Sequence, residues 1–180
     1  MMGQIMTCSK KMFDPLHPDV ELIDIADIAH SLSMLCRANG HFRSFYSVGQ
    51  HSINCAREAK ARGYSRWLQL ACLLHDASEA YLSDVTRPVK AELPKYKEIE
   101  EPLQETIWIK YLGRMLTAEE WTQVFQIDDD ILAHECIHLM GASIFDPTPE
   151  IFSTPEFSFT GFETCQKEMM DLFYQLQDPA

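Results

Sequence analysis

The chain has 180 residues, and its 27 acidic side chains outnumber its 15 basic ones, which gives a formal net charge of −12 at pH 7. A protein this acidic has no general attraction for nucleic-acid phosphates, so we expect no binding to duplex nucleic acid. Seven glycines and nine prolines exclude collagen-like and low-complexity architectures. The length suits one domain over residues 1–180, and the 46% hydrophobic content is enough for a proper core.

The start of the chain carries no basic segment followed by an apolar run, so we expect no signal peptide. No uncharged apolar stretch approaches about 18 residues, which predicts that no segment spans a membrane. The six cysteines form no Cys-x-x-Cys pair, and their scatter is typical of reduced core thiols in a cytoplasmic protein. They are Cys8, Cys36, Cys55, Cys72, Cys136 and Cys165.

Helical periodicity dominates and strand signals are scarce, so we predict an all-α fold, a bundle of about six or seven helices. Asp24 is the expected N-cap of a first helix that ends near Asn39-Gly40. A second helix is predicted from Ser47 to Gly63. Ser65 caps a third, which is apolar nearly all round over residues 70–74 and therefore central.

The segment 82–93 indicates a loop with a short helical turn around Pro88. A long amphipathic helix is predicted to follow Pro94 and to stop at Gly113. Pro102 lies inside that pattern and is expected to kink or split the helix, because proline lacks the amide hydrogen that the helix needs.

The sequence Thr117–Glu120 is a capping box that opens a short helix through Phe125. Another helix is predicted from about Asp128 to Met140. A Pro-rich loop over residues 141–162 follows, and an amphipathic C-terminal helix covers residues 163–177.

Adjacent His75 and Asp76 near the end of the apolar third helix are unusual, because burying either side chain costs several kcal/mol unless it is paired. Helical neighbours point about 100° apart, so the two can converge on an ion held against another helix. Glu79 is expected on the same helical face, as a group behind the ligands or for proton transfer. A solvated or hydrogen-bonded helix end is the simpler alternative.

Further candidate ligands lie elsewhere in the chain. His51 lies on the apolar stripe of the second helix, where a hydrogen-bonded core histidine is the usual case, and Asp128 opens a later helix. Two imidazoles and two carboxylates make a mixed nitrogen and oxygen site with open positions. Such a donor set fits Mn²⁺, Co²⁺, Fe²⁺, Ni²⁺ or Mg²⁺ better than a closed structural zinc.

The order His51, His75-Asp76, Asp128 resembles the metal signature of the HD-domain phosphohydrolases. Within this superfamily the chain is similar to the bacterial and phage 5'-deoxynucleotidase-like proteins, which include phage dATP triphosphohydrolases. The resemblance covers roughly residues 13 to 140. It is carried by the segments 24–26, 31–33, 36–41, 45–52 and 75–81, and it continues through Asp84, Arg87-Pro88 and Lys90.

The resemblance implies one divalent ion (Mn, Co, Fe, Ni, Mg or Zn), and a second ion remains open. Its ligands would be His51, His75, Asp76 and Asp128. For the last ligand the spacing to Glu135, seven residues later, favours Asp128, with Asp129 as the alternative.

The resemblance also implies residues that handle water and substrate. Glu79 and Asp84 match the two acidic groups for the attacking water and the leaving group, and the sequence does not say which takes which role. Four further residues are expected near the substrate: Arg37, His41, Arg87 and Lys90. Of these, Arg37 is expected to contact the phosphate.

Together these features predict a metal-dependent phosphohydrolase, a 5'-nucleotidase that releases phosphate from deoxynucleoside monophosphates and forms a homo-oligomer. One alternative is a dNTP triphosphohydrolase of the same fold, and another is a catalytically silent nucleotide sensor. A zinc protease is the least favoured, although His134–His138 fits H-E-x-x-H, because no third ligand follows at a convincing place.

Overall fold

The structure is a computed structural model that describes residues 3–177, and within them it is mostly helical, which confirms the all-α prediction. The described residues form eight α-helices, more than the six or seven expected, because two very short ones, α4 and α5, are included. The helices are α1 (Ile25–Met34), α2 (Val48–Ala61), α3 (Arg66–Leu73), α4 (Glu79–Leu82), α5 (Arg87–Ala91), α6 (Pro94–Leu112), α7 (Ala118–Glu135) and α8 (Phe162–Gln177). Two short antiparallel strands precede them, β1 (Ile5–Met6) and β2 (Met12–Phe13).

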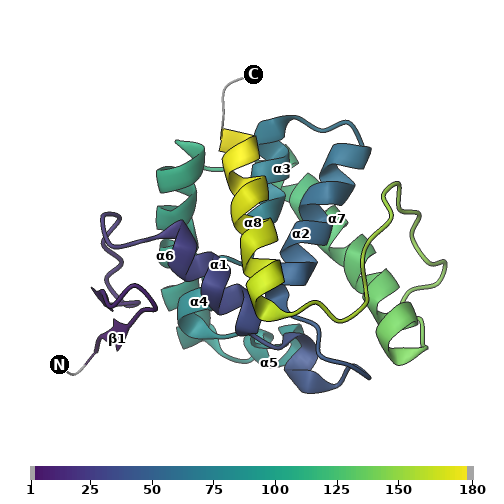
Figure 1. Ribbon diagram of the computed structural model, residues 1–180, viewed down its shortest axis with the longest axis horizontal. Helices are drawn as coiled ribbons and strands as arrows, with labels where there is room; N and C mark the ends of the chain where they lie inside the picture. Colours follow the sequence, from purple (N-terminus) through teal and green to yellow (C-terminus); the bar gives the residue numbers. More distant parts are fainter. Residues whose placement is uncertain (1–2, 178–180) are drawn as a thin grey trace.

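The helices pack around one apolar core. The C-terminal helix α8 lies against α1, α2 and α3, and α7 packs on the other side of α2 and α3 (Figure 1). Fully buried side chains from four of these helices meet in this core, for example Leu32, Leu73, Ile131 and Met169. The pair α2 and α3 is therefore the centre of the fold, as the apolar segment 70–74 predicted.

The first helix begins as predicted but ends early. The Asp24 side chain accepts a hydrogen bond from the amide two residues on, which caps α1. The helix stops at Met34 and not near Gly40, because Cys36 pairs with Ser47 in an isolated β-bridge that takes up the backbone groups. A separate 3-10 turn, Arg37–Gly40, then follows.

The second and third helices begin as expected. Ser47 and Gln50 form a capping box at the start of α2, and the Ser65 side chain caps α3. The prediction that Glu79 shares one helical face with His75 and Asp76 is wrong, because α3 ends after Leu73 and α4 begins only at Glu79.

A side chain distant in sequence explains this break. The Gln104 amide on α6 accepts from the Ser78 amide (3.0 Å) and donates to the Leu74 carbonyl (2.8 Å). These bonds satisfy backbone groups that an uninterrupted helix would have used itself. The turn between α3 and α4 is therefore stabilised by tertiary contacts, which the local sequence does not reveal.

Two predicted interruptions are absent from the described helices. The helix α6 runs without a break through Pro102 to a left-handed Gly113, so of the predicted kink or split, the split does not occur. The two helices expected after Thr117 are one helix, α7, which continues as a π-helical turn, Cys136–Met140. Val124, Ile127 and Ile131 keep one buried face at three-to-four spacing across the expected gap, so the helix has no reason to end there.

The Pro-rich segment is a loop as predicted, and part of it is firmly attached. We call residues 152–158 the strap; it passes along α2 at one side of the molecule (Figure 1). Three polar side chains, one turn apart on α2, bind its backbone. Gln50 donates to the Ser158 carbonyl (2.9 Å), Asn54 bonds both backbone groups of Glu156, and Glu58 accepts from the Phe152 and Ser153 amides.

Glu58 is the central group of this attachment. Its carboxylate is fully buried and also accepts from the Ser153 hydroxyl (2.6 Å) and from Arg62 Nε (2.8 Å). Arg62 in turn contacts Asp130 on α7 (2.7 Å). Burial alone raises the pKa of Glu58, but the bonds from Ser153 and Arg62 outweigh it and lower the pKa below its ordinary value.

Replacing Glu58 with Gln is expected to lower the free energy of unfolding by about 1–3 kcal/mol, because buried donors of the strap lose a charged acceptor. The folded carboxyl has a lowered pKa, so its stabilisation is present above the unfolded pKa of about 4.3 and is lost as pH falls through the folded pKa. The free energy of unfolding of Glu58→Gln should therefore fall less than that of the wild type as the pH is lowered. Urea unfolding at several pH values measures both effects, and exposed Glu98→Gln should change neither.

Candidate metal centre

The four predicted metal ligands come together from three parts of the fold. His51 Nε2 lies 3.2 Å from His75 Nε2 and 3.0 Å from Asp128 Oδ1. Asp76 Oδ2 lies 3.3 Å from His75 Nε2 and 3.8 Å from His51 Nε2. We call these four residues the His-Asp cluster; α2, the turn after α3, and α7 supply them.

The other ring nitrogen of each histidine is already bonded. His75 Nδ1 lies 2.7 Å from the Cys72 carbonyl, which only accepts, so this nitrogen carries the hydrogen. His51 Nδ1 lies 2.7 Å from Glu135, whose pKa is lowered, so the same holds there. Both Nε2 atoms therefore face the cluster, 3.2 Å apart and beside two carboxylates, where each can carry a proton or bind a metal ion. These nitrogen and oxygen atoms repel one another unless a positive charge lies between them.

The spacing of the donors also suits a metal ion. Nitrogen and oxygen ligands about 2.1 Å from one ion lie about 3.0 Å apart at right angles and about 3.4 Å apart in a tetrahedron. Three separations in the cluster, 3.0, 3.2 and 3.3 Å, fall in this range, and two others, 3.8 and 3.9 Å, are longer. The residues present thus fit a divalent ion with nitrogen and oxygen preference.

The electrostatics of the cluster favour a cation. Burial lowers the pKa of His75, but the Asp76 and Asp128 carboxylates outweigh it and hold the pKa well above its usual range. Burial raises the pKa of Asp128, but hydrogen bonds with His51 and His75 hold it well below its usual range. The carboxylates therefore stay ionised at neutral pH and attract positive charge, which a proton or a metal ion can supply.

Arg37 lies against the carboxylates of the cluster. Its Nε donates to Glu135 (2.9 Å), and its two terminal nitrogens face Asp128 (3.3 Å) and Asp76 (3.4 Å). The guanidinium is buried, and three carboxylates face its charge. Arg37, which was predicted to bind phosphate, therefore contacts two of the candidate ligands, Asp76 and Asp128.

The two predicted acids lie next to the cluster in unlike surroundings. Glu79 is buried, and burial together with the Asp76 and Asp84 charges raises its pKa to about 9. One of its oxygens has no hydrogen-bond partner among residues 3–177. Asp84 is half-buried and accepts from the Ala38 amide (3.3 Å), and burial raises its pKa as well. The raised pKa of Glu79 favours the protonated form of its carboxyl at neutral pH.

Two of the remaining predicted substrate residues, Lys90 and Arg87, lie against acidic side chains. Lys90 lies 3.5 Å from Glu79 and 2.7 Å from Glu100. Arg87 contacts both Asp128 and Asp129, so Asp129 faces Arg87 whereas Asp128 faces His51. This places the predicted ligand, and not its alternative, in the cluster.

Two further residues, His41 and Cys55, differ in their contact with the cluster. His41 is exposed at the end of the 3-10 turn, and the structure gives it no contact with the cluster. Cys55 was expected only as a core thiol, yet its sulfur lies 3.4 Å from His51 Nε2. Its place four residues after His51 on the same stripe was the sequence signal for this contact. Burial raises the pKa of the Cys55 thiol well above its usual range, so the sulfur stays protonated.

The H-E-x-x-H segment does not assemble as a zinc site in the described chain. His134 Nε2 lies 2.9 Å from the Pro149 carbonyl, and the His138 ring stacks on Phe157. Glu135 points to His51 and Arg37 instead. The motif is therefore divided among separate partners, and its glutamate belongs to the His-Asp cluster.

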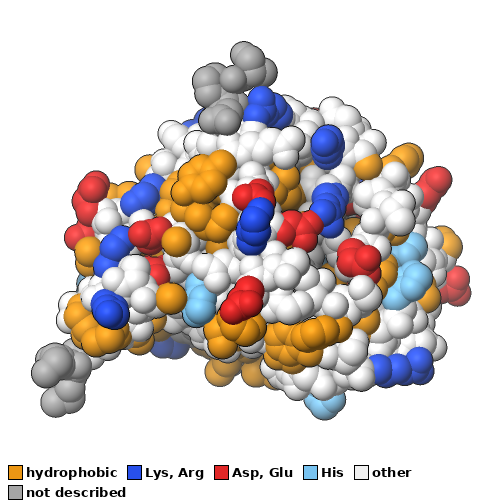
Figure 2. Space-filling view, in the orientation of Figure 1, with side chains coloured by type: hydrophobic (Ala, Val, Ile, Leu, Met, Phe, Trp, Pro, Cys, Tyr) orange, Lys and Arg blue, Asp and Glu red, His pale blue; other side chains and the backbone are white. Residues whose placement is uncertain are grey.

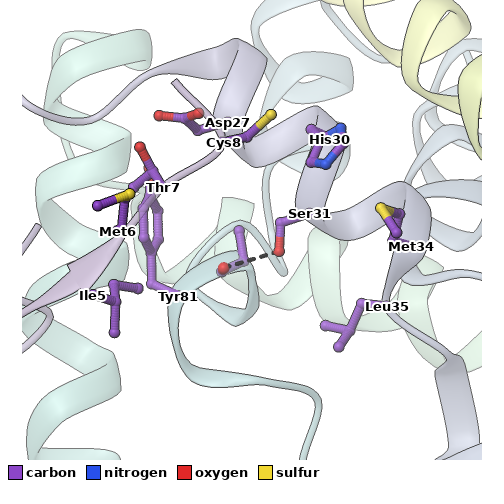
Figure 3. A pocket seen from close by; sticks show the side chains of 11 residues that line it. Ile5, Met6, Thr7, Cys8, Asp27, His30, Ser31, Met34, Leu35 and Tyr81 are labelled. Carbon is purple, nitrogen blue, oxygen red and sulfur yellow. Dashed lines mark hydrogen bonds between the residues drawn. The ribbon is translucent and has the colours of Figure 1, made fainter. Parts of the chain in front are cut away.

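A cavity of about 320 Å³ lies between the N-terminal strands, α1 and α4, and none of its lining residues belongs to the His-Asp cluster (Figure 3). The buried Asp27 carboxylate in its wall is already bonded to the amide and hydroxyl of Ser9. Ser31 donates to the Ala80 carbonyl, which ties α1 to α4 (Figure 3). The groups suited to chemistry thus gather at the cluster and not in this cavity.

On the face seen in Figure 2, basic and acidic side chains are interspersed. Within residues 3–177, none of the helices is both long and apolar enough to cross a bilayer.

Comparison with known proteins gives relatives without an assigned activity. No family model matches the chain. It is 40% identical over 112 residues to an uncharacterized protein of Escherichia coli, YfdR, covering 61% of this chain and 59% of the relative. It is 38% identical over 110 residues to an uncharacterized protein of Rhodobacter capsulatus, covering 57% of this chain and 55% of the relative. The chain thus spans less than two thirds of either relative.

The raised pKa of Glu79 predicts a pH dependence of stability. The unfolded carboxyl releases its proton near pH 4.3 and the folded one near pH 9, so the free energy of unfolding should fall with pH between these values, by at most about 1.4 kcal/mol per unit. Glu79→Gln removes this dependence. Chemical unfolding with a chelator present measures it. Wild-type and variant curves that stay parallel, as expected for exposed Glu105→Gln, would contradict the assignment.

Glu135 is expected to orient His51 for metal binding. Glu135→Gln keeps the size of the side chain but removes the charge that holds the His51 hydrogen on Nδ1 and balances Arg37. Loss of such a supporting carboxylate should weaken Mn²⁺ or Co²⁺ binding by about 10–100-fold. Isothermal titration calorimetry measures this, with exposed Glu163→Gln as the control. Equal affinity in wild type and Glu135→Gln would show that the contact is structural only.

Proposed function

We propose that the protein is a divalent-metal-dependent phosphohydrolase of the HD-domain superfamily that releases phosphate from deoxynucleoside 5'-monophosphates. The observation that carries this proposal is the convergence of two imidazole Nε2 atoms and two carboxylates in the His-Asp cluster. His51, His75, Asp76 and Asp128 would hold the ion. When bound, a divalent ion lowers the pKa of water and polarises phosphoryl oxygens.

Glu79 would serve as the proton donor. Its raised pKa keeps the proton on the carboxyl at neutral pH, where it can pass to the departing 5' oxygen as the P–O bond breaks. Asp84 would orient the attacking water and accept its proton as the new P–O bond forms. Asp84 is half-buried and bonded to the Ala38 amide, which suits a fixed position near solvent. The sequence left these two roles open, and the unlike surroundings support this division.

The charges around the cluster favour one phosphate over three. Arg37, Arg87 and Lys90 each face carboxylates. A triphosphate needs more uncommitted positive charge than a monophosphate, so these pairings speak against the triphosphohydrolase alternative. The buried, protonated Glu79 speaks against a silent sensor, which needs no proton donor. We further propose that the enzyme acts in the cytoplasm as a homo-oligomer.

The test uses the full chain, stripped with chelator and reloaded with single ions, against a panel of nucleoside mono- and triphosphates. Phosphate release from deoxynucleoside monophosphates is expected, with no release of triphosphate. Asp76→Ala should lose both metal binding and turnover. Glu79→Gln should keep the metal and lose turnover by about 10²–10⁴-fold, because only proton transfer is removed. Exposed Glu105→Gln is the matched control, and normal hydrolysis by Asp76→Ala would sink the proposal.

A further inference from the structure

The two oxygens of the Asp128 carboxylate face different groups. Oδ1 lies in the His-Asp cluster, 3.0 Å from His51 Nε2. Oδ2 accepts from one terminal nitrogen of Arg87, and the other terminal nitrogen of Arg87 contacts Asp129. One carboxylate is thus shared between the cluster and a guanidinium.

Arg87 differs from the other two cations near the site in its exposure to solvent. Arg37 is buried and held by Glu135, and Lys90 is bonded to Glu100 (2.7 Å). The Arg87 side chain is 52% exposed, and α5, which carries it, has no buried residue. A ligand that arrives from solvent can therefore contact the guanidinium of Arg87.

A guanidinium in this place has opposite effects on the two proposed ligands. Its positive charge repels a divalent ion that uses the other oxygen of Asp128, and it draws electron density from that carboxylate. The same group attracts a phosphate, whose oxygens match its fork of donors. A phosphate bound between the ion and the guanidinium would be attracted by both, and its negative charge would offset the repulsion between them.

We propose that Arg87 couples the two binding events, disfavouring the ion alone and favouring the ion together with phosphate. This rests on the proposed function, since it requires that the His-Asp cluster takes a divalent ion. Because coupling between two ligands is reciprocal, phosphate should tighten ion binding by the factor by which the ion tightens phosphate binding. Arg87 thereby ties retention of the ion to the presence of a phosphate ligand.

Calorimetric titration with Mn²⁺ and inorganic phosphate tests this on the full chain. In Arg87→Gln, Mn²⁺ alone should bind about 5-fold tighter, and phosphate should bind the Mn²⁺-loaded protein about 10-fold more weakly, so that coupling is largely lost. Arg87→Lys keeps the charge and should retain the weaker Mn²⁺ binding with part of the phosphate affinity. Arg57→Gln is the matched control, because Arg57 is a half-exposed arginine paired with Glu168.

A fall of both affinities in Arg87→Gln would mean that Arg87 only holds Asp128 in place, and this overturns the inference, as do unchanged affinities. Failure of the proposed function looks different, because the wild-type chain would then neither bind Mn²⁺ nor hydrolyse nucleotides. Wild-type binding and hydrolysis with unaltered coupling in Arg87→Gln would overturn the role of Arg87 alone.

Discussion

The buried Glu135 carboxylate is the contact on which the site depends. It accepts from His51 on α2 and from Arg37 in the 3-10 turn, so two separate segments are fixed to α7 through one side chain. Burying a carboxylate without partners costs several kcal/mol, and here both oxygens are bonded. With Asp76 and Asp128 added and Arg37 subtracted, two negative charges remain, which is the charge that a divalent ion balances.

The break between α3 and α4 serves this arrangement. In a continuous helix His75, Asp76 and Glu79 would follow one another at fixed angles, and Glu79 would have the same access to the cluster as the ligands. The turn held by Gln104 lets His75 and Asp76 face His51 while Glu79 lies in a more buried place beside Lys90. The Gln104 side chain therefore supports both the packing of the core and the geometry of the site, through bonds to Ser78 and Leu74 rather than to the candidate ligands.

Features that depend on neighbouring residues could be predicted from the sequence, whereas features that depend on tertiary contacts could not. The caps at Asp24, Ser47 and Thr117 depend on neighbours within three residues, and all three were predictable. The candidate ligands were predicted because His75 and Asp76 near the end of an apolar helix need partners, and because the order His51, His75-Asp76, Asp128 resembles a known metal signature. The early end of α1, the α3 break and the carboxylate contacts of Arg37 depend on residues far away in the chain, so no local pattern could reveal them.

The opposite pKa shifts of neighbouring carboxyls give the site its proposed division of labour. Asp128 is hydrogen-bonded to two imidazoles and stays ionised, which suits a metal ligand. Glu79 is buried beside other carboxylates and keeps its proton. Groups of one chemical type thus acquire different roles through their surroundings alone. Because a positive ion in the cluster would weaken the repulsion that Asp76 exerts on Glu79, the proton of Glu79 would be held less tightly once the ion is bound. Proton donation would then be easiest in the loaded site, where it is needed.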